Sequence, residues 1–509
     1  MNGIKILKPI VILWLLAFPA IPLFSQAEVN APVQYIIRRI DYHITGKTKS
    51  QALERKLDLK EGEHFSGKPE LDEYTAEKNQ ELYNLRAFQE SSSVTYRLGE
   101  AEEDGNIPVY LEVSVIDSSS FIILPEPKYD SNAGFTLSLD LREHNFLGTL
   151  SPFKFDLRWK TDEKKRTSAG FLLDAALPFR AFGYNWNFTV LNDFKYYFTG
   201  EPAYSKTALG LSMELPWSFT TFTFGFDQGF ILHEENDEKD DIEDGEYHDW
   251  YLFSKLYADW EIPTPLEIGI FGKLTYTPGI YGNINYQPGG EDIGELRRGP
   301  SAGFKQELGF GRIDWKGNFR EGLKAALIND NEYNFHREGW DSSLTISALG
   351  HLRVSRLFGF SGRIRYSRWF GDPYTLGGDV IRGYRDDEIR ANERLSLNLE
   401  FPFRLIRFVP SEWTNNKKYH YFDFEQHWSL FADFLMAGAS NKKTNSPPLR
   451  FTPEDIITTA GLEIITFPLK WRSVYLRISA GWNIREWVRT GKLPSGIHRE
   501  IYLGMGHFF

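Results

Sequence analysis

The segment GFTLSLDLR at residues 134–142 decides the fold class. Apolar residues stand at every second position, at 135, 137, 139 and 141, and polar or charged residues fill the positions between them. A period of two is the pattern of a β-strand with one apolar and one polar face. The same alternation recurs at 395–401 and 474–480, and similar segments continue from about residue 121 to the end. Helical periodicity is nearly absent there, so residues 121–509 are predicted to be a β-sheet domain.

The length of these segments favours a transmembrane β-barrel over a soluble β-sandwich. Many of them run to about ten residues, which is the span that a tilted transmembrane strand requires, whereas strands of soluble proteins usually have about 5–6. The chain is 16% aromatic, and Trp and Tyr residues near the segment ends fit an interfacial girdle. As many as thirteen candidate strands precede residue 376, and five follow it at 392–403, 426–437, 454–466, 470–485 and 497–509.

The N-terminus predicts export from the cytoplasm. Lys5 and Lys8 precede an apolar stretch at 10–24, and Ser-Gln-Ala follows at 25–27, so residues 1–27 are expected to be a signal peptide. The chain has no cysteine, which excludes disulfides, thiolate metal sites and a lipid-anchored N-terminal cysteine. Its net charge of -11 argues against a nucleic-acid binder, which would present a basic face.

Residues 28–117 have a different pattern, typical of a small α+β domain. A strand is expected at 36–44, then two helices, then strands at 94–98 and 109–115, in the order βααββ. This order, with LKEGEHF at 59–65 between the helices and Phe88 after the second one, resembles a POTRA domain. Such a domain has an open sheet edge that can accept an extended peptide. A plain structural spacer is the alternative.

Three short motifs extend the resemblance to nearly the whole chain: NFLGT at 145–149, VIRGY at 380–384 and FADFLMAG at 431–438. In this order, between a POTRA-like unit and a terminal phenylalanine, they resemble the bacterial surface antigen superfamily of BamA- and TamA-like barrels. One departure is that the family's usual glycine soon after the aspartate is delayed to Gly438.

The resemblance implies a transmembrane antiparallel β-barrel of about 16 strands, integral to the outer membrane, with the POTRA-like domain in the periplasm. It implies an assembly factor that folds and inserts other outer-membrane proteins without a cofactor. The expected partners are unfolded outer-membrane proteins, outer-membrane lipid and possible periplasmic chaperones or accessory lipoproteins. A two-partner-type transporter that secretes a dedicated polypeptide is the alternative.

In this family the loop carrying VIRGY folds into the barrel, and strand parity then predicts its partners. Glu400 has the opposite parity to its apolar neighbours, and so has Asp433, so both carboxylates are expected to face the lumen. The planar fork of Arg382 suits such carboxylates through charge-assisted bonds. Gly383 permits a tight backbone, and Tyr384 is expected to pack on the wall. Solvated charges on an exterior loop are the alternative.

A lateral seam is predicted where the first and last strands meet. Pro125 and Pro127 lie two residues apart in the segment 121–129, so one edge of that strand lacks two amide donors. Proline is tolerated at an edge or bulge, and this edge is expected to face the last strand, which ends at Phe509 and is softened by Gly504 and Gly506. The alternative is that 121–129 is only a linker into the barrel.

No enzyme is predicted, because the chain has no nucleophile elbow, no His-Glu-x-x-His motif and no phosphate-binding loop. The acidic run at 234–249 misses the spacing of a calcium loop and is interpreted as a charged exterior loop, so no metal site is expected.

Overall fold

The computed structural model describes residues 34–505 and 508, with gaps at 104, 119–120, 131–133, 163–164, 201, 234–249, 268–271, 291–292, 294–297, 371–373, 376–379, 385–389, 439–455 and 473. The predicted signal peptide at 1–27 lies outside the described residues, and so do Gly506 and Phe509. No helix among the described residues is both long and apolar enough to cross a bilayer.

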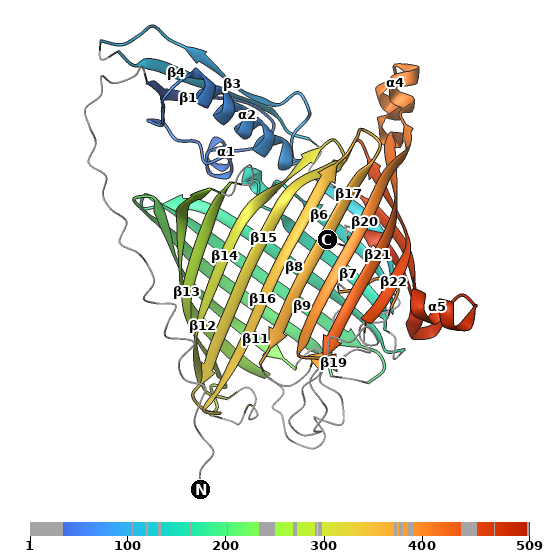
Figure 1. The fold of residues 1–509 in the computed structure, drawn as a ribbon. Helices are drawn as coiled ribbons and strands as arrows, with labels where there is room; N and C mark the ends of the chain where they lie inside the picture. Colours follow the sequence, from blue (N-terminus) through green and yellow to red (C-terminus); the bar gives the residue numbers. More distant parts are fainter. Residues whose placement is uncertain are drawn as a thin grey trace.

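Within the described residues, 18 antiparallel strands close into a single barrel (Figure 1). Each barrel strand pairs with the next barrel strand along the chain, and the last strand pairs with the first. The strands are β5 Phe121–Asp130, β6 Gly134–Glu143, β7 Phe153–Thr161, β8 Thr167–Ala181, β9 Tyr184–Tyr197, β10 Tyr204–Trp217, β11 Thr220–Leu232, β12 Trp250–Glu267, β13 Lys273–Tyr286, β14 Pro300–Lys316, β15 Phe319–Asn334, β16 Gly339–Arg353, β17 Gly359–Trp369, β20 Glu393–Phe408, β21 Phe424–Gly438, β22 Ile456–Pro468, β23 Leu476–Asn483 and β24 Arg499–Met505.

The expected number of about 16 strands, taken from the family resemblance, is therefore wrong. Counting the alternating segments themselves had given thirteen strands before residue 376 and five after it, and the barrel contains β5 to β17 before that point and β20 to β24 after it. The segment 121–129 is not a linker, because β5 pairs with β6 from Phe121 to Asp130. The raw count of alternating segments, in which as many as thirteen preceded the loop, agrees with the 18 strands, and the number implied by the resemblance does not.

The barrel wall has an apolar outer face and a polar inner face. In β6 the outward side chains of Leu137 and Leu139 are about half exposed, at 47% and 45%, whereas the alternating residues Ser138 and Asp140 are buried. The same alternation places Leu397 outside and Asn398 inside in β20. Figure 1 shows the long tilted strands that carry this pattern around the barrel.

Residues 35–116 form a separate α+β unit at one end of the barrel (Figure 1). It consists of β1 Tyr35–Thr45, α1 Ser50–Lys56, β2 His64–Phe65, α2 Lys68–Asn84, β3 Ser93–Leu98 and β4 Ile107–Ile116. The sheet order is β2-β1-β4-β3, with β1 parallel to β4. The predicted order βααββ lacks the two-residue strand β2, which is too short to leave a periodic signal in the sequence.

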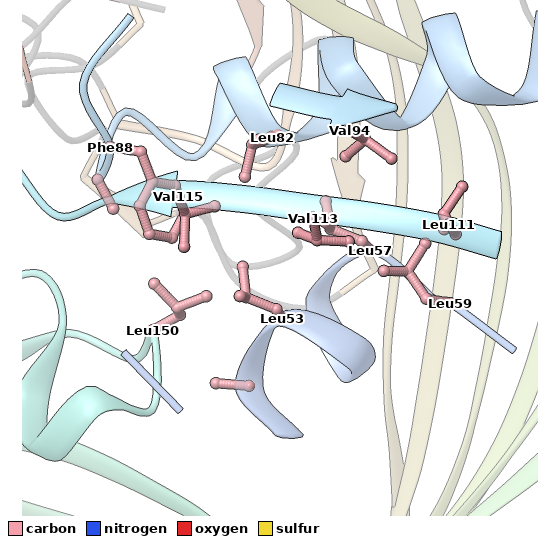
Figure 2. Close-up of a cluster of buried hydrophobic side chains, with 12 residues drawn as sticks. Leu53, Leu57, Leu59, Leu82, Phe88, Val94, Leu111, Val113, Val115 and Leu150 are labelled. Atoms are coloured by element: carbon pink, nitrogen blue, oxygen red, sulfur yellow. The ribbon is translucent and has the colours of Figure 1, made fainter. Parts of the chain in front are cut away.

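The α+β unit is docked on the turns at that end of the barrel. Figure 2 shows Leu150, from the turn between β6 and β7, beside Leu53 and Val115 in the core of the unit. In the same turn, the side-chain amide of Asn145 donates to the Thr48 hydroxyl at 2.6 Å. Positions far apart in sequence therefore share one hydrophobic core.

A second contact holds the other side of the unit. Asn84, at the end of α2, donates to the Asp314 carboxylate of β14 at 2.9 Å. The Arg86 guanidinium stacks 4.2 Å from the Trp315 ring centroid and donates to the backbone carbonyl of Arg472. Burial, followed by repulsion from Arg472, lowers the pKa of Arg86 to about 10. The unit thus spans from the β6–β7 turn to the β14–β15 and β22–β23 turns.

Candidate functional site

Residues 380–384, in the connection between β17 and β20, lie in the barrel lumen, and 380–383 are buried. The short strands β18 Tyr374–Thr375 and β19 Arg390–Ala391 pair with each other on either side of this segment. Ile381 and Arg382 are 0% and 1% exposed. Leu376 to Asp379 lie outside the described residues.

The structure places the Arg382 guanidinium between the two carboxylates that strand parity had selected. Nε and a terminal nitrogen of Arg382 donate to the two oxygens of Asp433 at 2.9 and 2.8 Å, and its other terminal nitrogen donates to Glu400 at 2.5 Å. The backbone amide of Arg382 also donates to Asp433 at 2.9 Å. This is the bidentate geometry that an arginine provides and a lysine does not.

Further charges surround this centre, led by Glu463 of β22 and Arg477 of β23. A Glu463 carboxylate oxygen lies 3.5 Å from Arg382 and 3.0 Å from Arg477, at ion-pair distance but without hydrogen-bond geometry. Asp433 and Glu463 are both fully buried. Arg320 of β15 interacts electrostatically with Glu400 and Glu463 as well. The loop is therefore anchored in a network of buried charges and not by a single pair.

Aromatic rings cover the arginine as well. The Arg382 guanidinium lies 4.0 Å from the ring centroid of Phe431 and 4.3 Å from that of Phe508. Phe431 is two residues before Asp433 on β21 and therefore shares its lumen-facing side. Such cation–π contacts add roughly 0.5–2 kcal/mol each, with the larger values at desolvated sites.

Gly383 has a steric role next to this network. Its φ is +82°, and a Cβ there would lie 2.6 Å from the Trp482 amide nitrogen and 2.8 Å from the Gly481 carbonyl carbon on β23. Its amide donates to the Glu500 carboxylate of β24 at 2.9 Å. Only glycine allows the loop backbone to lie this close to the wall.

The flanking residues fix the loop through apolar contacts. Val380 and Ile381 pack with Ala391 and Leu435, and Tyr384 packs against this cluster. The Tyr384 ring also meets His498 edge to face at 5.5 Å. The backbone carbonyl of Val380 accepts from the Asn398 side chain at 3.1 Å.

Sequence reasoning missed Glu463, Arg477, Glu500 and the two covering phenylalanines. Glu463 and Glu500 lie in segments that were recognised as strands, and their lumen-facing parity was readable. Their distance from the loop depends on how the barrel closes, which brings β22, β23 and β24 around residue 382. Parity can place a residue in the lumen, but it cannot give its height or its neighbours.

The last strand β24 pairs with the first strand β5 and so closes the barrel. Among the described residues only Tyr502 with Asp130 and Leu503 with Tyr129 are paired, whereas β5 pairs with β6 over its whole length. Continuing the register would bring Met505 opposite Pro127, which has no amide to donate. The Met505 amide instead donates to the Glu126 carboxylate at 2.9 Å.

Three of the predicted seam residues, Pro125, Pro127 and Gly504, lie in the two strands of this junction. Pro125 and Pro127 are exposed on the outer face of β5. Gly504 lies in β24 opposite Arg477 of β23. Gly506 and Phe509 lie outside the described residues.

Comparison with known proteins gives likenesses of fold at low sequence identity. No family model matches the chain, and no curated protein matches it. CdiB from Acinetobacter baumannii has a TM-score of 0.49 at 11% identity, with 92% of this chain and 73% of that one covered. BamA from Haemophilus ducreyi lacking POTRA domains 1-3 has a TM-score of 0.37 at 13% identity, with 93% and 85% covered.

An iron transporter, FrpB from Neisseria meningitidis, has a TM-score of 0.38 at 12% identity, with 82% of this chain and 87% of that one covered. These values do not distinguish a BamA-type barrel from a CdiB-type barrel. The seam, the loop and the lumen of this chain carry the features that bear on its function.

Proposed function

We propose that this protein is an integral outer-membrane barrel that folds and inserts other outer-membrane β-barrel proteins through the seam between β24 and β5. The outward apolar side chains around a closed barrel support the membrane location, because soluble proteins rarely expose so large a continuous apolar surface. The described helices and strands at 35–116 support a POTRA-like periplasmic domain, and the lysine-flanked apolar N-terminus supports a signal peptide at 1–27.

The proline-bearing edge of β5 at the seam is the observation that carries the proposal, because Pro127 has no amide to donate where the register meets Met505. Separating two strands exposes unpaired amide and carbonyl groups, and each lost ladder bond costs roughly 0.5–1.5 kcal/mol. Within the described residues the junction is paired at Tyr502–Asp130 and Leu503–Tyr129, so opening this part of it breaks fewer bonds than opening the β5–β6 ladder would. An unfolded client strand can then pair with the exposed edge by β-augmentation.

The loop supports the seam from inside the barrel. Arg382 ties the loop to β20 and β21, while Gly383 reaches Glu500 on β24. The loop therefore connects β20 and β21 to β24, which is the strand on one side of the seam. We infer that a seated loop holds β24 in register and keeps the lumen closed while β24 and β5 separate.

Secretion of a dedicated polypeptide is the second candidate function. A polar cavity of about 330 Å³ beside β5 to β9 favours it, since a transporter needs a path through the lumen. Depletion of the protein in its host distinguishes the two. An assembly factor is expected to reduce the membrane levels of barrel proteins in general, whereas loss of a single exported protein would establish a transporter and overturn the proposal.

A further inference from the structure

The polar cavity lies inside the barrel next to the seam, and its lining is strongly basic. Strands β5 to β9 form its wall, and Tyr502 and Met505 of β24 close it at the seam. Two carboxylates, Glu126 and Asp156, are part of the lining. The cationic side chains of the lining are Lys128, Arg142, Lys154, Arg158, Lys160 and Lys195.

The acidic partners of these cations lie deeper in the wall than the cations do. The Asp140 side chain is 2% exposed, and Arg142, which pairs with it, is 32% exposed. The Asp156 side chain is 10% exposed, and Lys154, 3.8 Å away, is 34% exposed. The surface presented to the cavity is therefore positive, although several cations have an acidic neighbour beneath them.

The opposite wall of the lumen holds a compact acidic group. There the Tyr281 hydroxyl of β13 donates to the carboxylates of Asp330 and Glu332 of β15 at 2.9 and 3.1 Å. These two carboxylates form a compact acidic group that is not part of the cavity lining. The basic surface thus lies on the side of the barrel that begins at the seam.

We propose that this basic cavity holds acidic side chains of a client polypeptide strand that has entered at the seam. On β7, Lys154, Arg158 and Lys160 share one face with Asp156, and every second residue of a strand is spaced by roughly 6.6–6.8 Å. Two carboxylates two residues apart on an extended client match the spacing of Arg158 and Lys160, and Lys154 lies further along the same face. The β-barrel clients of the proposed function, on which this inference rests, have strands whose lumen-facing side is polar at every second position.

Cations spread over β5, β6, β7 and β9 suit an extended polypeptide better than a compact phosphate. Lys128 also lies 5.5 Å from the Tyr502 ring centroid of β24, which places one cation at the seam itself. A client strand that pairs with β5 would keep its outward side chains in lipid and direct its inward ones at this surface. The cavity therefore selects clients by the charge of their lumen-facing side.

The test uses the full chain reconstituted in lipid vesicles and three dye-labelled peptides of alternating sequence, (Thr-Glu)6, (Thr-Gln)6 and (Thr-Lys)6. Fluorescence anisotropy measures binding to the unmodified protein, to Lys154→Gln/Arg158→Gln/Lys160→Gln, and to the opposite-wall control Lys305→Gln/Lys324→Gln. We expect the Glu peptide to bind at least tenfold more tightly than the other two. The β7 variant is expected to lose that preference, and the control variant to keep it.

Salt provides a second readout, because charges at a lumen surface are screened over about 8 Å at 0.15 M ionic strength. The preference for the Glu peptide is expected to shrink steadily as salt is raised. Equal binding of Glu and Gln peptides overturns the inference. Equal competition by inorganic phosphate also overturns it, and identifies a general anion site instead.

The same vesicles separate this inference from the proposed function. Unmodified protein that inserts no client at all contradicts the proposed function. Unmodified protein that inserts clients, together with a β7 variant that inserts acidic-lumen and neutral-lumen clients at unchanged relative rates, contradicts the charge selection alone.

Discussion

Replacing Arg382 with alanine is expected to release the loop from the lumen without unfolding the barrel. The substitution removes the three bonds to Asp433 and Glu400 that the guanidinium makes, and it leaves these buried carboxylates without their hydrogen-bonding cation. Breaking a buried ion pair by removing one partner costs about 3–5 kcal/mol. At about 1.4 kcal/mol per tenfold, the population of unseated loop should rise on the order of a hundred- to a few-thousand-fold.

Cysteine labelling measures that population directly, because the chain contains no cysteine of its own. Val380, at 3% exposure, is replaced by cysteine in otherwise unmodified protein, and the rate of maleimide labelling reports loop opening. Adding Arg382→Ala should raise the rate up to the limit set by a fully open loop. Arg382→Lys, which keeps the charge and loses the planar fork, should give an intermediate rate.

The matched control is Lys305→Ala, which removes a half-exposed lumen pair with Glu307 at 3.3 Å. Such a pair contributes about 1 kcal/mol or less, so the labelling rate should stay unchanged. A labelling rate in Arg382→Ala within twofold of its parent would refute the idea that this arginine holds the loop.

Three further outcomes are expected. Gly383→Ala should also unseat the loop, because φ is +82° and the new Cβ would meet the β23 backbone. Gly491→Ala, with φ +65° and open space around the new Cβ, should leave labelling of the Val380→Cys thiol unchanged. Equal labelling in the two variants would contradict the steric role of Gly383. Leu150→Ala should weaken docking of the α+β unit by about 2–3 kcal/mol, seen as faster hydrogen exchange in α1, since Leu150 completes its core; unchanged exchange would contradict this. Burial, and then repulsion from Arg142, lowers the pKa of His144, so the opened β6–β7 turn binds more protons than the closed one below about pH 6.5. Opening of this turn, measured by hydrogen exchange, should become easier as the pH falls from 7.5 to 5.5. His144→Gln should remove this pH dependence.

The sequence predicted the antiparallel barrel and the lumen-facing side of two residues of the candidate site. Alternation of apolar and polar residues requires no tertiary information, which is why the barrel could be predicted from segments such as 134–142, whereas the predicted number of about 16 strands was wrong. Parity alone also put Glu400 and Asp433 on the lumen side, where Arg382 meets both.

The remaining features depend on closure of the barrel and could not be read from one segment. Glu463 and Glu500 approach residues 382 and 383 because β22 and β24 lie on the same side of the closed wall. The docking of Leu150 in the core of the α+β unit joins positions about a hundred residues apart, and Leu150 itself looked like an ordinary turn residue. The basic cavity likewise arises only when β5 to β9 curve around it.

A reversible disulfide across the seam tests the central claim most directly. Tyr129→Cys and Leu503→Cys replace a registered pair on β5 and β24, and Leu137→Cys with Trp159→Cys serves as the control pair on β6 and β7. The assay is the rate at which vesicles containing each variant fold an added small barrel protein, followed by its resistance to protease. We predict that oxidation stops client insertion in the seam variant and that reduction restores it. Neither treatment should change the insertion rate of the control variant. Full insertion with the seam cross-linked would contradict the account.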